Sequence, residues 1–186
     1  MQEIVVMACF DDNTNKTLMN YRKDLSGILN KEMAGDWIPH ITLGCYSLDD
    51  NKVQELILWI KEITCKISPI NIEFNSVGTF YHSEKYPNTN VIYAAPSIPK
   101  KLYDLYCEYH SKFDEYSSSI GEDYSMIIGQ PTIHSTITIC DKDEYLKAIK
   151  YIWNNFKQIN TEINCIKVYN MNKDLITTVD FKRRKK

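Results

Sequence analysis

The sequence predicts an α+β protein in which two similar halves place antiparallel strands around a central cleft, with helices packed outside. Three observations support this. Strand-like apolar segments alternate with segments whose apolar residues recur at helical spacing. The order of these elements is the same in both halves of the chain. A short motif, His-x-Thr, occurs once in each half at the same place in that order.

The first half begins with a continuous apolar run that is typical of a buried strand. Two amphipathic helices follow, which Asn13–Thr14 and Asp49–Asp50 can cap, and the first His-x-Thr segment lies between them. The helices have the apolar stripes Leu18, Tyr21, Leu25, Ile28, Leu29 and Val53, Leu56, Ile57, Ile60. The strands expected in this half cover residues 4–10, 38–43, 71–80 and 91–95.

The second half repeats this order. Pro99 opens one helix and Asp141 caps the other, and the second His-x-Thr segment lies between them. Their stripes are Leu102, Leu105, Tyr106, Tyr109, Phe113 and Tyr145, Ile149, Ile152, Trp153, Phe156. The strands expected here cover residues 133–139, 162–169 and 175–181. The 186 residues are therefore interpreted as one domain with pseudo-symmetric lobes, approximately 12–96 and 97–181.

Composition narrows the class of protein. A formal net charge of -2 gives no overall basic field for nucleic acid, so an RNA contact requires a local patch. The basic run 182–186 is interpreted as a solvated tail, with an RNA-binding arm as the alternative. The 6 cysteines form no C-x-x-C pair, which argues against a metal site built from them. No stretch resembles a membrane span or signal peptide, so we expect a cytoplasmic protein with reduced thiols, and we favour a monomer.

The repeated motif carries most of the functional argument. On a strand, residues i and i+2 point to the same face, so His40 and Thr42 form one pair and His134 and Thr136 another. Two imidazoles and two hydroxyls around one point provide acid–base chemistry on a phosphate ester without a metal. The alternative is that each histidine is a core or rim residue and each threonine an ordinary strand residue. Two such motifs in matching positions favour the catalytic interpretation.

The segment Pro39-His40-Ile41-Thr42-Leu43 resembles the first motif of the 2H phosphoesterase superfamily, in the group of bacterial 2'-5' RNA ligases and RNA 2',3'-cyclic phosphodiesterases. The segments 74–80 and 91–96 resemble the middle region of that group. The second motif departs from the family pattern, since Ile133 rather than proline precedes His134 and Ser135 replaces an apolar residue.

This resemblance implies a metal-independent phosphodiesterase that acts on 2',3'-cyclic phosphate ends of RNA, or joins RNA ends reversibly through 2'-5' linkages. It implies that His40 and His134 are catalytic, that Thr42 and Thr136 bind phosphate, and that no cofactor is needed. The expected partner is an RNA end or a nucleotide. Two alternatives stay open: a hydrolase of a small cyclic nucleotide or other small phosphodiester, and a non-catalytic module that binds RNA ends.

Other residues are candidates for substrate contact. Tyr81, His82 and Trp37 are placed where an aromatic ring or imidazole could stack on a base, although packing is the competing interpretation. His110 is interpreted as a surface residue. The lysines that could line approaches to the cleft are Lys61, Lys85, Lys100 and Lys101.

Overall fold

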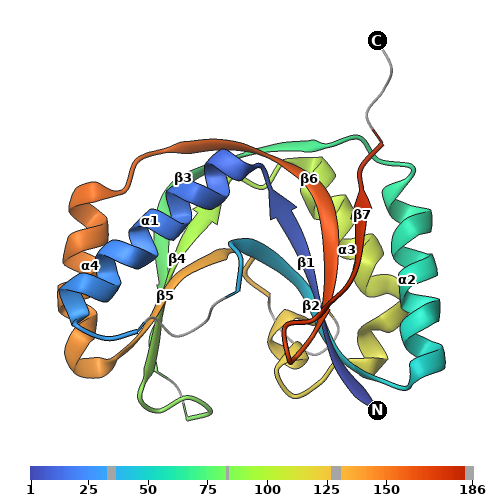
Figure 1. Cartoon of the computed structure of the whole chain (residues 1–186), viewed down its shortest axis with the longest axis horizontal. Coiled ribbons are helices and arrows are strands. Elements are labelled where there is room, and N and C mark those ends of the chain that lie inside the picture. The colour runs from blue at the N-terminus through green and yellow to red at the C-terminus, as the bar shows by residue number, and fades with distance from the viewer. Residues whose placement is uncertain (33–36, 83, 127–130, 183–186) are drawn as a thin grey trace.

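The computed structural model describes residues 1–32, 37–82, 84–126 and 131–182. Within these residues, seven strands form one antiparallel sheet, and four α-helices and two short 3₁₀ helices complete the fold (Figure 1). The strands are β1 (Gln2–Phe10), β2 (His40–Leu48), β3 (Ile70–Phe80), β4 (Thr89–Pro96), β5 (Ser135–Asp141), β6 (Ile159–Asn170) and β7 (Leu175–Asp180). The helices are α1 (Asp12–Leu29), α2 (Asp50–Thr64), α3 (Lys100–Phe113), η1 (Asp114–Tyr116), η2 (Gly121–Tyr124) and α4 (Lys142–Asn155). The predicted fold class is confirmed.

Local signals explain where the helices begin. Asp11 caps α1, because its carboxylate accepts a hydrogen bond from the backbone N–H of Thr14 at 2.8 Å. The cap therefore lies just before the predicted Asn13–Thr14 pair. Asp141 caps α4 as predicted, in a reciprocal capping box with Glu144.

The sheet diverges into two arms. Its order is β2-β1-β6-β3-β4-β5, and β7 pairs with β6. The central strands β3 and β6 pair only over Ile70–Phe74 and Ile159–Ile163, and beyond this stretch β3 pairs with β4 while β6 pairs with β1 and β7. The arms separate below this junction, and the two strands at the ends of the order, β2 and β5, lie next to each other in the middle (Figure 1).

The two halves of the sequence are interleaved in space. The chain contains the unit β-α-β-α-β twice, as β1 to β3 and as β4 to β6, and each unit contributes its last strand to the other arm. The segments 12–96 and 97–181 are therefore not separate lobes, because β5 pairs with β4 and β6 lies between β1 and β3. Strand exchange, which sequence order alone does not reveal, is the reason for this difference.

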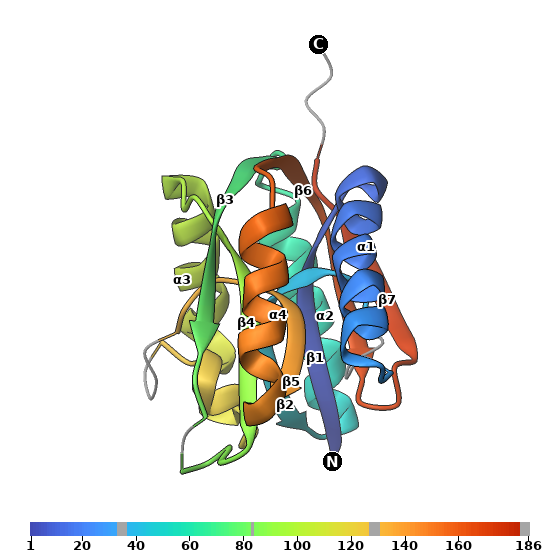
Figure 2. The same cartoon turned by 90° about the vertical axis from the view of Figure 1, so that its left-hand side faces the viewer.

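The helices cover the outside of both arms. Helices α1 and α4 pack together on one arm, and α2 and α3 pack together on the other (Figures 1 and 2). The main hydrophobic core lies between them and the sheet. A smaller cluster of Val5, Met7, Cys9, Cys45 and Cys165 packs against Trp37, Ile38, Tyr124 and Tyr169. In the part of the chain that the structure describes, no helix has the length and apolar character needed to cross a bilayer.

Candidate active site

The two motif segments present alternating faces, as their sequence predicts. Ile41, Leu43, Ser135 and Ile137 are buried, whereas His40, Thr42, His134 and Thr136 are half-buried. His40 is the first residue of β2, and His134 comes immediately before β5. The residues between and after the motif positions thus anchor each segment in the core, while the histidines and threonines are left accessible on the other face.

Both imidazoles are held in the same way. The Nδ1 of His40 lies 2.6 Å from the carbonyl oxygen of Ile38, and the Nδ1 of His134 lies 2.6 Å from that of Thr132. A carbonyl oxygen only accepts hydrogen bonds, so each Nδ1 carries a proton. In the neutral form, each Nε2 then has a free lone pair. Each histidine can therefore accept a proton at Nε2, or donate one from Nε2 after protonation.

Thr42 and Tyr124 connect the surroundings of His40 with those of His134. The Nε2 of His40 lies 3.1 Å from the Oγ1 of Thr42, whose hydroxyl can donate to it. Tyr124 of η2 makes a side-chain hydrogen bond with Thr42, and its ring stacks on that of His134 with centroids 6.2 Å apart. The charge of His134 also acts on His40. Tyr124 and this electrostatic effect link the two motifs, although the described lining of the cavity beside His134 includes His134 and Thr136 and not His40 or Thr42.

Burial lowers the proton affinity of both histidines. Desolvation is the main cause that lowers the pKa of His40 to about 4, and the charges of Arg22 and His134 lower it further. Desolvation also lowers the pKa of His134. The hydrogen bonds to the Ile38 and Thr132 carbonyls oppose these shifts without reversing them. Both imidazoles are therefore neutral at pH 7 in the free protein.

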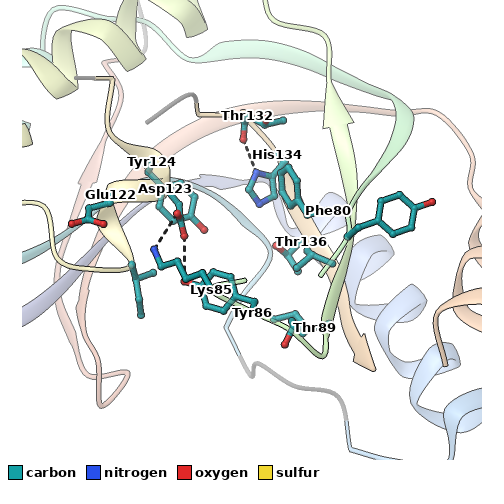
Figure 3. A pocket seen from close by; sticks show the side chains of 14 residues that line it. Phe80, Lys85, Tyr86, Thr89, Glu122, Asp123, Tyr124, Thr132, His134 and Thr136 are labelled. Atoms are coloured by element: carbon teal, nitrogen blue, oxygen red, sulfur yellow. Dashed lines mark hydrogen bonds and ion pairs between the residues drawn. The ribbon is translucent and has the colours of Figure 1, made fainter. Parts of the chain in front are cut away.

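An aromatic cavity of about 720 Å³ opens beside His134. The ring of His134 contacts the rings of Phe80 and Tyr93, each with centroids 5.0 Å away, in addition to Tyr124. Figure 3 shows His134 and Thr136 at one side of this cavity. The described residues that line it are Phe80, Tyr81, Lys85, Tyr86, Thr89, Val91, Ile120, Glu122, Asp123, Tyr124, Thr132, His134, Thr136 and Ile139.

The side of the cavity away from His134 is polar. The ammonium group of Lys85 lies 3.1 Å from Asp123, whose carboxylate also accepts a hydrogen bond from the Tyr86 hydroxyl at 3.2 Å (Figure 3). The connection between β3 and β4 is thereby joined to η2. With Glu122 included, the described lining carries one cationic side chain and two anionic ones.

The weaker site candidates have different outcomes. Tyr81 lines the cavity and is 66% exposed, while His82 is exposed but not part of the lining. Trp37 packs edge-on against Tyr169, with ring centroids 5.6 Å apart. Whether any of them contacts substrate stays a prediction.

Two expectations about charged residues need correction. His110 is not a surface residue: it is 2% exposed, and its Nδ1 lies 2.7 Å from a carboxylate oxygen of Asp114. Of the four lysines named above, Lys85 lines the cavity, while Lys61, Lys100 and Lys101 lie on α2 and α3. Most of the basic tail, residues 183–186, lies outside the described residues.

Sequence reasoning missed two residues of the site. Tyr124 belongs to a short 3₁₀ helix in a polar segment that shows no periodic pattern, so nothing in the sequence singled it out. Arg22 did leave a signal. It follows Leu18 by four positions and precedes Leu25 by three, which places a basic residue within the apolar stripe of α1.

Comparisons with known proteins support the fold through structure alone, since no family model and no curated protein sequence matches the chain. The protein TT0787 of Thermus thermophilus has a TM-score of 0.67 at 8% identity, over 98% of this chain and 100% of that one. Escherichia coli LigT has a TM-score of 0.61 at 10% identity, over 98% of both chains. Usb1 of Kluyveromyces marxianus has a TM-score of 0.54 at 10% identity, over 96% and 97%.

These neighbours show that the chain shares the fold of TT0787, LigT and Usb1 over nearly its whole length. Structures of LigT hold 3'-AMP or phosphate, and the Usb1 structure holds uridine monophosphate. At identities of 8–11%, the likeness shows a common fold. The chemistry has to be argued from this chain's own residues.

Proposed function

We propose that this protein is a metal-independent phosphodiesterase of the 2H type. It opens 2',3'-cyclic phosphates at RNA ends and, in the reverse direction, forms 2'-5' linkages. The observation that carries the proposal is the matched orientation of His40 and His134, each fixed through Nδ1 with Nε2 left for proton transfer. The bound 3'-AMP and phosphate of LigT, and the uridine monophosphate of Usb1, are consistent with such a substrate.

The two histidines can complete hydrolysis between them. One neutral imidazole takes a proton from water at Nε2 as the water oxygen bonds to phosphorus. The other, protonated, gives its Nε2 proton to the ribose oxygen as the bond from phosphorus to that oxygen breaks. Thr42 and Thr136 donate hydrogen bonds to the non-bridging oxygens, which are charged acceptors and so bind strongly. The pseudo-symmetric placement leaves the roles of base and acid open between His40 and His134.

The proposal is tested by turnover of 2',3'-cyclic nucleotides, RNA with a cyclic end and 2'-5' linked oligonucleotides, all with EDTA present. We expect EDTA-insensitive turnover that His40→Ala and His134→Ala each reduce by at least about 10²-fold, the scale of acid–base catalysis. The double variant should lose little more, because the pair acts as a unit. Lys23→Ala is the control, since Lys23 is exposed on α1 and does not line the cavity. Activity that disappears with EDTA and returns with a divalent ion would contradict the metal-free assignment.

A small cyclic nucleotide is the second candidate substrate, and the cavity lining favours it. Of the three charged side chains in the described lining, Lys85 is paired with Asp123 and Glu122 adds a further negative charge. Such a surface repels a run of phosphates but suits the base of one nucleoside, which can stack on aromatic rings. An RNA substrate would then place its terminal nucleoside in the cavity and the rest of its chain elsewhere. Cytoplasmic location stays a prediction.

A further inference from the structure

Arg22 occupies a core position on α1. Its side chain is 8% exposed, and it lies on the same buried stripe as Leu18 and Leu25. Arginine is rarely this buried unless its guanidinium has partners. Its partners therefore indicate what the residue does.

The guanidinium joins the segments that carry the two motifs. Its Nη1 donates to the carbonyl oxygen of Trp37, three residues before His40. Its Nη2 donates to the carbonyl oxygen of Thr136, a residue of the second motif, at 2.7 Å. The planar fork of arginine suits two acceptors at a fixed separation. One side chain from a third element thus connects both halves of the candidate site.

In the part of the chain that the structure describes, no acidic side chain pairs with Arg22. Among the described residues, Arg22 forms no ion pair, and both of its oxygen partners are neutral carbonyls. Burial lowers its pKa, but a guanidinium keeps its proton in proteins. The charge acts on His40. An uncompensated buried charge is costly, and an anionic ligand at the neighbouring site would offset that cost.

We propose that Arg22 is a positioning residue, which holds the two His-x-Thr segments at one separation and supplies positive charge to a phosphate bound between them. The phosphodiester chemistry in this inference rests on the proposed function. The connection of the two segments by Arg22 and its attraction for an anion do not depend on the proposed function. Among the described residues, the groups that face His40 are Arg22 from α1, His134 from the segment before β5, and the uncharged Thr42.

The test uses Arg22→Gln, Arg22→Lys and the control Lys23→Gln, which removes the same charge from an exposed position on the same helix. NMR titration of the histidine rings, with and without inorganic phosphate, gives a readout that does not depend on turnover. In Arg22→Gln we expect the His40 midpoint to rise towards 6.5, phosphate binding to weaken, and kcat to fall by about 10²-fold, the scale of a misplaced reacting group. Lys23→Gln should match the wild-type protein in all three.

Arg22→Lys separates charge from geometry. A lysine keeps the charge but lacks the fork, so the His40 midpoint should stay near its wild-type value while kcat stays low. This variant also decides the matter if Arg22→Gln does not fold. Wild-type kcat in Arg22→Lys, or an unmoved His40 midpoint with unchanged phosphate binding in folded Arg22→Gln, overturns the proposal. If the wild-type protein turns over no cyclic phosphate, the proposed function fails, whereas the effects of Arg22 on titration and phosphate binding still decide this inference.

Discussion

At the scale of single residues, the tautomers of His40 and His134 set what the site can do. In both histidines, the Nδ1–H group donates a hydrogen bond to the carbonyl oxygen of the residue two positions earlier in the chain. This is a consequence of the chain's own geometry, since a residue that begins a strand lies close to the turn that leads into it. The pairing of each histidine with a threonine was predictable from period-2 spacing. The backbone partner was not, because it depends on the turn.

The pH dependence of turnover follows from the lowered pKa values. The productive enzyme has one neutral and one protonated imidazole, and this form is most populated between the two free-enzyme pKa values. The pKa of His40 is about 4 and that of His134 is below 6.5. We therefore expect kcat/KM to peak below pH 6.5 and to fall as the pH rises through the lowered pKa of His134.

The profile of kcat provides the matching check. A bound phosphate anion favours the charged imidazole and raises both pKa values, so the kcat optimum should lie at higher pH than that of kcat/KM. Initial-rate assays with a 2',3'-cyclic nucleotide over about pH 4 to 9 measure the pH profiles of both kcat and kcat/KM. A kcat/KM that stays constant up to about pH 8 would show that the free histidines are not held neutral in this way.

At the scale of elements, the sequence predicted the order of the described strands and α-helices, although β2 runs to Leu48, five residues beyond the predicted end. Strong periodic patterns, together with Asp141 and Pro99 at helix starts, were sufficient for this. The irregular segment between α3 and β5 was not predictable. It carries Tyr124, and Asp114 joins its beginning to Ser125 by a buried hydrogen bond of 2.7 Å. Such contacts depend on tertiary structure rather than on local pattern.

The pairing of β3 with β4 supports His134 through a glycine. Gly78 lies opposite Tyr93, and a Cβ at this glycine would lie 2.3 Å from the Tyr93 ring. That ring contacts His134. Gly78→Ala should therefore displace the ring, lower stability by about 1–3 kcal/mol through overpacking, and reduce kcat.

Gly27→Ala is the control for this substitution, because Gly27 lies in α1 with no atom near the position of a Cβ. It should raise stability by up to about 1 kcal/mol and leave kcat unchanged, since alanine is the better helix former. Thermal unfolding and turnover measure both effects. A Gly78→Ala protein with wild-type stability and kcat would show that Tyr93 is free to move aside and does not position His134.

At the scale of the whole molecule, strand exchange brings the two motifs together. Each β-α-β-α-β unit gives its last strand to the other arm, and the edge strands β2 and β5 then meet in the middle. The sequence indicated the duplication and the cleft. It did not indicate that the arms share elements, because repeat order is the same whether or not the units exchange strands. One consequence is that disturbing either unit affects both arms.

The distribution of charge over the molecule predicts how substrate binding responds to salt. The net charge is -2, and the one lysine among the described lining residues is paired with Asp123. Few phosphates beyond the reacting one should therefore meet a cation, and each such contact adds about 0.7 to the salt slope for single strands. We expect KM values for a cyclic mononucleotide and a cyclic-ended oligonucleotide to be within a few-fold of each other, both with shallow salt dependence.

A protein that ends at Phe181 tests whether the basic tail changes this expectation. Both substrates are assayed at two salt concentrations with the full-length and the shortened protein. A steep slope for the oligonucleotide that disappears on shortening would assign the RNA contact to the tail. A steep slope in both proteins would mean that a cationic surface outside the cavity binds the RNA chain, against the expectation from the cavity lining. Equal shallow slopes would leave the terminal nucleotide as the only part of the substrate that the protein recognises, because counterion release would then come from the reacting phosphate alone.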